Sequence, residues 1–308
     1  MVSATALCHG AATIVNAIAT GKGAAFGLGL SAKATVELKD EGSVTAIDVK
    51  EPKLVEACVR NVLKLFDYGY GATIRVESEV PIARGLKSSS VVANAAVLAT
   101  FGALAKRHGK IKMLRIDKEL SRQQLVIGDE EIKDETILDI GVKSAKEAGV
   151  TITGALDDAA AAYFGGFVVT DNTQNKILRR GEMEKLSAAI FVPDKQTHTR
   201  DFDVERAKTF SREVEAVWQM ALSGDIYTAM TLNGLIYSAV VGNKKEDPAL
   251  IAAAAMDAGA VAAGLSGTGP AVVAITKGDP DRILNVWGGL DGRLIQTKVS
   301  SEKAKVIL

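Results

Sequence analysis

A turn-rich segment in the first third of the chain has the residue types of an anion-binding loop. A helix N-terminus presents unpaired backbone N–H groups and a partial positive charge, and both attract phosphate or carboxylate groups. Glycine lets the backbone approach an anion closely, and successive serines add hydroxyl donors. One serine alone would be an ordinary N-cap, but serines together with proline and glycine favour a phosphate loop. The segment, between a strand pattern and a long apolar helical pattern, comprises Pro81, Ala83, Arg84, Gly85, Leu86, Lys87, Ser88, Ser89 and Ser90.

Two commoner nucleotide-binding motifs are not supported by the residue spacing. The Gly21-Lys22 pair is followed by Gly23 where a Walker loop requires serine or threonine, and Asn16 stands in place of its first glycine. Residues 27–32 have the spacing GxGxxA of a dinucleotide site, but a strand pattern follows instead of a helix. A phosphate loop of another type is therefore favoured, and a nicotinamide-dependent oxidoreductase remains an alternative.

Two further glycine loops carry polar residues. Asp157 and Asp158 are adjacent carboxylates ahead of the Gly165-Gly166 pair, and near a phosphate loop they could orient a hydroxyl group and accept its proton. They could equally be acidic residues in the first turn of a helix, complementing its dipole. The third loop, Gly267-Thr268-Gly269, precedes a strand pattern and fits either a tight turn or a wall against a transferred phosphate.

The composition argues against several classes of protein. Lys+Arg and Asp+Glu both number 37, so the formal net charge is zero and a nucleic-acid-binding surface is not indicated. The two cysteines, Cys8 and Cys58, have the spacing of neither a zinc site nor a disulfide framework. The apolar stretches 91–105 and 251–265 are shorter than the roughly 20 residues of a membrane span, so we expect buried helices. These features predict a cytoplasmic protein that binds neither nucleic acid nor membrane.

The elements that would position the loops show both strand and helix patterns. Alternating apolar residues predict strands over residues 34–39 and 72–79, with 44–49 as a hairpin partner of the first. Short strands are expected at residues 167–170, 188–192 and 271–276. Helical spacing is found at residues 52–66, 204–220 and 226–241. Helices are also expected over the alanine-rich residues 88–106, the charged residues 117–148 and the helix-prone residues 248–263. This mixture indicates an α+β fold of two packed domains, residues 1–165 and 166–308.

Taken together and in this order, the three loops resemble those of the GHMP kinase superfamily of small-molecule kinases. Its central signature is Pro-x-x-x-Gly-Leu-x-Ser-Ser-x-Ala, and the segment from Pro81 to Ser89 matches it, with Val91 in the place of the alanine. A closer similarity is to the archaeal-type shikimate kinase branch, through residues 16–27, 153–158 and 233–238. The resemblance implies a two-domain fold with mixed and antiparallel sheets packed on helices.

The resemblance also implies ATP as phosphate donor and Mg²⁺ as its metal ion. The phosphate loop together with Gly267, Thr268 and Gly269 would bind ATP, and Ser89 would reach the metal. The family's acidic metal ligand lies 11 residues before its catalytic aspartate, and counting back from Asp158 implies Glu147. Asp157 is the alternative for the catalytic aspartate. The family's early lysine is missing beside His9, so Lys22 is the expected substitute.

Within that branch the implied acceptor is the 3-hydroxyl of shikimate, on the route to chorismate and the aromatic amino acids. The carboxylate of shikimate needs a cation, for which Lys22 and Arg200 are the candidates, and arginine offers the better bidentate geometry. Asp157 and Tyr237 are expected in the same pocket, although Tyr237 also fits a core position. Alternatives are a kinase of the homoserine or mevalonate type, or a non-catalytic binding protein on the same fold. The expected assembly is a monomer or homodimer.

Overall fold

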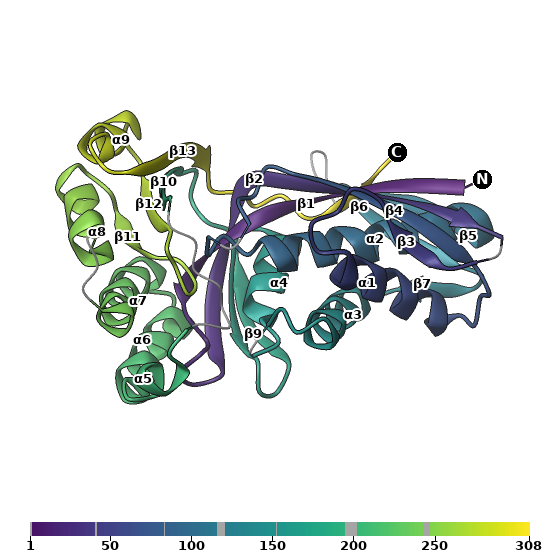
Figure 1. Ribbon diagram of the computed structural model, residues 1–308, viewed down its shortest axis with the longest axis horizontal. Coiled ribbons are helices and arrows are strands. Elements are labelled where there is room, and N and C mark those ends of the chain that lie inside the picture. Colours follow the sequence, from purple (N-terminus) through teal and green to yellow (C-terminus); the bar gives the residue numbers. More distant parts are fainter. Residues whose placement is uncertain are drawn as a thin grey trace.

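Two long antiparallel strands run through the centre of an elongated molecule (Figure 1). They are β1 (Val2–Val15) and β2 (Lys22–Lys39). The computed structural model describes residues 2–40, 42–82, 84–115, 121–151, 153–194, 202–242 and 247–308. Many buried side chains of β1 and β2 are alanines, and such small side chains let helices pack close to the sheet.

Among the described residues, β1 and β2 belong to a seven-stranded sheet with the order β14-β1-β2-β4-β3, in which β8 also pairs with β2 and with β9. The other strands are β3 (Val44–Ala46), β4 (Gly71–Ser78), β8 (Phe167–Asp171), β9 (Lys176–Gly181) and β14 (Lys305–Ile307). The predicted hairpin between residues 34–39 and 44–49 is wrong, because β3 pairs in parallel with β4. The helix between β3 and β4 supplies the crossover that parallel strands require.

A layer of helices covers one face of this sheet (Figure 1). It consists of α1 (Pro52–Leu65), α2 (Ser88–His108), α3 (Asp134–Glu147) and α4 (Leu156–Phe164), and the predicted helices at 52–66 and 88–106 are thereby confirmed. By length and composition α2 could cross a membrane, but 89% of its apolar window is buried inside the protein. The helix is therefore a core element, and its first turn starts beside the phosphate loop.

A smaller antiparallel sheet contains β5 (Gly109–Arg115), β6 (Ser121–Ile127) and β7 (Glu130–Ile132). Here the helix predicted over residues 117–148 is wrong for residues 121–132, and α3 begins only at Asp134. Leu125, Val126 and Ile127 are all buried in β6, and such a short apolar run without alternation cannot be told from a buried helix segment by its periodicity in the sequence.

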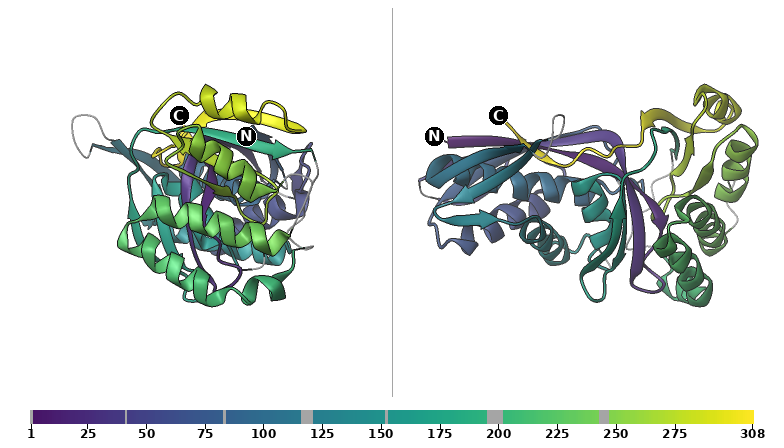
Figure 2. Two further views of the ribbon diagram at one scale, coloured as in Figure 1. Left: turned by 90° about the vertical axis from the view of Figure 1, so that its left-hand side faces the viewer. Right: turned by 180° about the vertical axis from the view of Figure 1, so that it is seen from behind.

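The C-terminal part is built on an antiparallel sheet with the order β11-β12-β10-β13. Its strands are β10 (Ser187–Pro193), β11 (Ala262–Leu265), β12 (Val272–Thr276) and β13 (Gly292–Lys298), and its helices are α5 (Val204–Lys208), α6 (Ser211–Ser223), α7 (Ile226–Val241), α8 (Pro248–Asp257) and α9 (Asp281–Trp287). Figure 2 shows α6, α7 and α8 side by side at this end of the molecule. The β8–β9 pair follows residue 165 yet joins the sheet of β1 and β2, and the domain boundary stays a prediction.

Candidate active site

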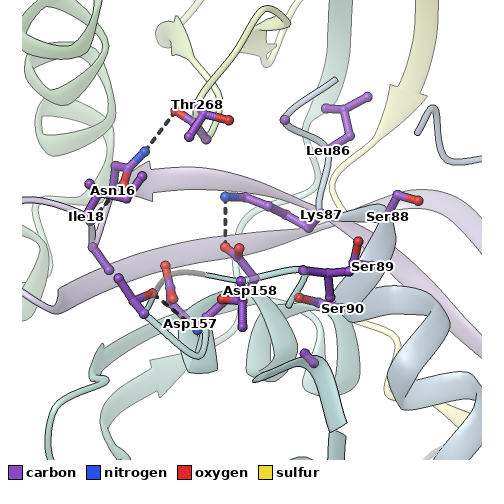
Figure 3. Close-up of a pocket in the computed structure, with 18 of the residues that line it drawn as sticks. Asn16, Ile18, Leu86, Lys87, Ser88, Ser89, Ser90, Asp157, Asp158 and Thr268 are labelled. Atoms are coloured by element: carbon purple, nitrogen blue, oxygen red, sulfur yellow. Dashed lines mark hydrogen bonds and ion pairs between the residues drawn. The ribbon is translucent and has the colours of Figure 1, made fainter. Parts of the chain in front are cut away.

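The three glycine loops surround one pocket, shown in Figure 3. The end of β1, the start of α2, the start of α4 and the turn between β11 and β12 all contribute to its wall. The polar and charged residues that line it are Asn16, Arg84, Lys87, Ser88, Ser89, Ser90, Thr151, Thr153, Asp157, Asp158 and Thr268. The chain thus brings together segments more than 250 residues apart, and the predicted phosphate loop faces both predicted carboxylates.

The phosphate loop is fastened to the third glycine loop. Gly85 has a φ of 80°, and a Cβ at this position would collide with the backbone oxygen of Ser266. The Ser266 hydroxyl donates a hydrogen bond of 2.8 Å to the Gly85 carbonyl, and the Ala271 N–H donates one of 3.2 Å to the Arg84 carbonyl. Glycine is therefore required at position 85 both for backbone conformation and for the close approach of the two loops.

An ion pair crosses the pocket from the first loop to the second. Lys87 Nζ lies 2.9 Å from Asp158 Oδ1, and the two side chains are only 10% and 15% exposed (Figure 3). This Oδ1 is buried and accepts no hydrogen bond of good geometry, so the close contact with Lys87 is chiefly electrostatic. Gly267 leaves room for the lysine, since a Cβ there would lie 3.2 Å from Nζ.

Asp157 has a different environment from its neighbour. It is 3% exposed, and its Oδ1 accepts a hydrogen bond of 2.8 Å from the Asn172 side-chain amide. Burial, and then the charge of Asp158, raise the pKa of Asp157 to about 7, while Lys87 acts in the opposite direction. Gly23 on β2 makes this burial possible, because a Cβ at that position would collide with Asp157 Oδ2. A protonated Asp157 beside an Asp158 paired with a cation would divide donor and acceptor roles between two carboxyl groups.

Tyr237 contacts the backbone of Asn16, which is part of the pocket wall. Its hydroxyl donates to the Asn16 carbonyl at 3.2 Å and accepts from the Ala19 N–H at 3.3 Å, and burial raises the pKa of Tyr237. The Asn16 side chain in turn donates a hydrogen bond of 2.8 Å to the Gly267 carbonyl. Tyr237 is not found among the described lining residues, and its predicted contact with substrate stays a prediction.

Lys22 occupies a different environment from the two aspartates. Its Nζ lies 2.8 Å from Glu215 Oε1 and 4.7 Å from the centre of the Trp218 ring. It is not found among the described residues that line the pocket, where Lys87 takes the position beside Asp158. Its catalytic and substrate-binding roles stay predictions.

The two predicted metal ligands, Ser89 and Glu147, make different contacts and line different hollows. Glu147 Oε2 accepts a hydrogen bond of 2.8 Å from the Asn61 side chain, and Glu147 lines a separate hollow between α1 and α3. Ser89 Oγ instead donates a hydrogen bond of 3.3 Å to Glu51 Oε2, just before α1. The pairing of Ser89 with Glu147 around a metal ion stays a prediction.

The remaining predicted site residues either lie outside the described residues or do not line the pocket. Ala83 and Arg200 lie outside the described residues, and their predicted roles stay predictions. Gly269 donates from its N–H to the Ser266 carbonyl at 2.9 Å within the third loop, and neither it nor Pro81 is a described lining residue. The sequence analysis missed several polar residues around the carboxylates, which reach the site only through tertiary packing. These are Asn16, Thr151, Thr153 and Asn172.

Comparison with known protein families gives a consistent result over most of the chain. The model for the GHMP kinases N terminal domain matches residues 53–166, and the model for the GHMP kinases C terminal domain matches residues 206–289. These two matches and the similarity to full-length relatives show that this chain belongs to the GHMP kinases.

Individual relatives agree with this assignment. The chain is 42% identical over 306 residues to a shikimate kinase of Methanothrix thermoacetophila, covering 98% of this chain and 95% of that protein. It is 39% identical to a shikimate kinase of Methanosarcina mazei, covering 97% and 95%. Among solved structures, the homoserine kinase of Cytophaga hutchinsonii superposes with a TM-score of 0.69 at 16% identity, covering 100% of this chain and 98% of that chain. The mevalonate kinase of Methanococcus jannaschii gives the same TM-score and identity, covering 96% and 98%, and both structures share the α+β fold with this chain.

Proposed function

We propose that this chain transfers the terminal phosphoryl group of ATP to the 3-hydroxyl of shikimate, giving shikimate 3-phosphate and ADP. The observation that carries the proposal is the 42% identity, over 98% of the chain, to a protein named shikimate kinase. The pocket supports it, because the phosphate loop, two carboxyl groups and a lysine face one space. The reaction would belong to chorismate and aromatic amino acid biosynthesis, and two unpaired buried cysteines favour the cytoplasm as its location.

The side chains at the start of α2 suit a triphosphate with Mg²⁺. When bound, ATP supplies the phosphoryl group and Mg²⁺ offsets the negative charge that moves with it. Ser88, Ser89 and Ser90 offer hydroxyl groups at the positive end of the α2 dipole. Mg²⁺ prefers hard oxygen ligands and needs only one or two carboxylates from a protein. Ser89 would therefore hold the ion with one glutamate, either the predicted Glu147 or Glu51, which contacts Ser89 directly.

The two aspartates suit the acceptor side of the reaction. As the acceptor oxygen bonds to phosphorus and the bond from phosphorus to ADP breaks, the hydroxyl proton needs a base. Asp158 is the proposed base, because its carboxyl group lines the pocket and is held 2.9 Å from the Lys87 ammonium group. Asp157, whose raised pKa favours a protonated carboxyl, would donate a hydrogen bond to a substrate oxygen. Lys22 and Arg200 remain the proposed candidates for the substrate carboxylate.

The test is an assay that couples ADP release to a visible readout, with ATP, Mg²⁺ and one acceptor at a time. We expect turnover with shikimate and at least about 100-fold lower kcat/KM with homoserine, mevalonate or galactose, since those acceptors would leave buried polar groups unpaired. Turnover with another acceptor instead would assign a different kinase of the family. Binding of shikimate and ATP by folded protein without any ADP release would favour the non-catalytic binding protein.

A further inference from the structure

Lys87 is held in a position that is unfavourable for a lysine in three independent ways. It is the N-cap of α2, with left-handed backbone angles of φ 63° and ψ 28°, which residues other than glycine rarely adopt. Its ammonium group lies in a pocket wall, where only 10% of the side chain is exposed, and lysine burial costs solvation energy. It also stands at the positive end of the α2 dipole, where a cation is repelled.

Stability alone does not account for this placement. The ion pair with Asp158 offsets part of the cost, but a buried pair often does no better than apolar side chains of similar size. Local strain that persists in a folded protein tends to mark a functional site.

An anion in the pocket would remove two of these three costs. The Lys87 ammonium and the start of α2 both lie on the pocket wall, so a phosphoryl group between them would be attracted by both. Arg84 is the other cationic side chain among the described lining residues, and one of its guanidinium nitrogens donates to the Pro193 carbonyl. Lys87 is therefore the lining cation that also contacts the base carboxylate.

We propose that Lys87 is the cation of the transfer centre, holding the Asp158 carboxylate in place and stabilising the charge of the phosphoryl group during transfer. This inference rests on the proposed kinase function. In the step, the oxygen–phosphorus bond to the acceptor forms and the bond from phosphorus to ADP breaks. The acceptor proton passes to Asp158, while Lys87 keeps its own proton throughout.

The first experiment compares Lys87→Met and Lys87→Arg with the wild type in the shikimate assay. We expect Lys87→Met to lower kcat by about 100-fold or more, because a charge-stabilising donor is lost, with the KM for shikimate changing by less than about 3-fold. Lys87→Arg should recover part of kcat, since it restores the charge. Lys110→Met, on the exposed strand β5, is the matched control and should behave as the wild type. A kcat for Lys87→Met within about 3-fold of wild type, or a large loss in Lys22→Met alone, would overturn the proposal.

The second experiment needs no turnover. Thermal unfolding of wild type, Lys87→Met, Asp158→Asn and the double variant forms a double-mutant cycle. If the two side chains interact as proposed, the fall in Tm of the double variant is clearly smaller than the sum of the two single falls. Additive falls would overturn the pairing. If the cycle shows coupling and Lys87→Met also weakens binding of an ATP analogue, but shikimate is not phosphorylated, the acceptor is wrong and the role of Lys87 stands.

Discussion

The Asn172 side-chain amide donates a hydrogen bond of 2.8 Å to a carboxylate oxygen of Asp157, which is 97% removed from solvent. Thr170 fixes the amide orientation by donating from its hydroxyl to Asn172 Oδ1 at 2.7 Å. Thr170 lies in β8 and Asn172 is the first residue of the turn that follows it, so the end of this strand positions the amide that holds the buried carboxyl group. This arrangement makes Asp157 a rigid part of the pocket wall, with a titration that folding alters.

The first prediction concerns the pH dependence of stability. Asp157 binds its proton more tightly in the folded chain, where its pKa is about 7, than in the unfolded chain, where it is about 4. The folded state therefore holds more protons between these values, and the contribution of Asp157 to the free energy of unfolding falls as pH rises from about 4 to 7.

Replacing Asp157 removes this dependence. We expect the difference in Tm, Asp157→Asn minus wild type, to become steadily more positive as the pH is raised from about 4 to about 7. Differential scanning calorimetry at a series of pH values measures it. Asp129→Asn, at an exposed turn, is the control and should show no such trend. A difference that stays constant over this range would mean that Asp157 titrates normally.

The second prediction assigns the base. Asp158→Asn keeps the size of the side chain but accepts no proton, so kcat should fall by about 1,000-fold, within the usual range for loss of a general base. The affinity for an ATP analogue should stay measurable by isothermal titration calorimetry. Asp257→Asn, on the exposed end of α8, serves as the control. Near-normal turnover in Asp158→Asn would transfer the role to Asp157.

The third prediction separates backbone strain from close packing in the phosphate loop. Gly85→Ala adds a Cβ against the Ser266 carbonyl at a φ of 80°, whereas Gly259→Ala has a φ of 102° and nothing within 4 Å. Strain alone should lower the free energy of unfolding by about 1–2 kcal/mol in Gly259→Ala. Gly85→Ala should lose more and should also weaken binding of the ATP analogue by at least about 10-fold, because the loop must shift. Equal losses in both variants would argue against the close approach of the two loops.

The fourth prediction concerns Mg²⁺. If Glu51 holds the ion with Ser89, Glu51→Gln raises the Mg²⁺ concentration needed for half-maximal ATP binding by about 10-fold, while Glu147→Gln leaves it unchanged. The reverse result would support the family spacing that points to Glu147. Titration of Mg²⁺ in the presence of a non-hydrolysable ATP analogue distinguishes the two without turnover.

The local parts of the site could be predicted from the sequence. The segment from Gly85 to Ser90 leads into a long apolar helix, and glycine conformation with helix-end electrostatics leads the sequence to predict an anion site there. The helices 52–66 and 226–241 were likewise predictable, since three-and-four apolar spacing matches burial along one face, and the helix 88–106 was predictable from its long alanine-rich apolar run. Helix formation and loop conformation depend mainly on residues close together in the chain. The family signature adds the order in which the three glycine loops follow one another.

Only the tertiary structure decided which charged groups meet. Lys22 and Lys87 are both lysines beside a glycine-containing loop, yet Lys22 pairs with Glu215 on α6 and Lys87 with Asp158 on α4. The burial of Asp157 depends on Gly23 in β2 and on Asn172 in the turn after β8. The partner of β3 could not be predicted from the sequence either, because β3 pairs with β4 only after the chain has passed through a helical crossover. Such contacts join residues that are far apart in the chain. Several partners are chemically possible for each charged residue, and local spacing and residue type do not show which one lies next to it in the folded protein.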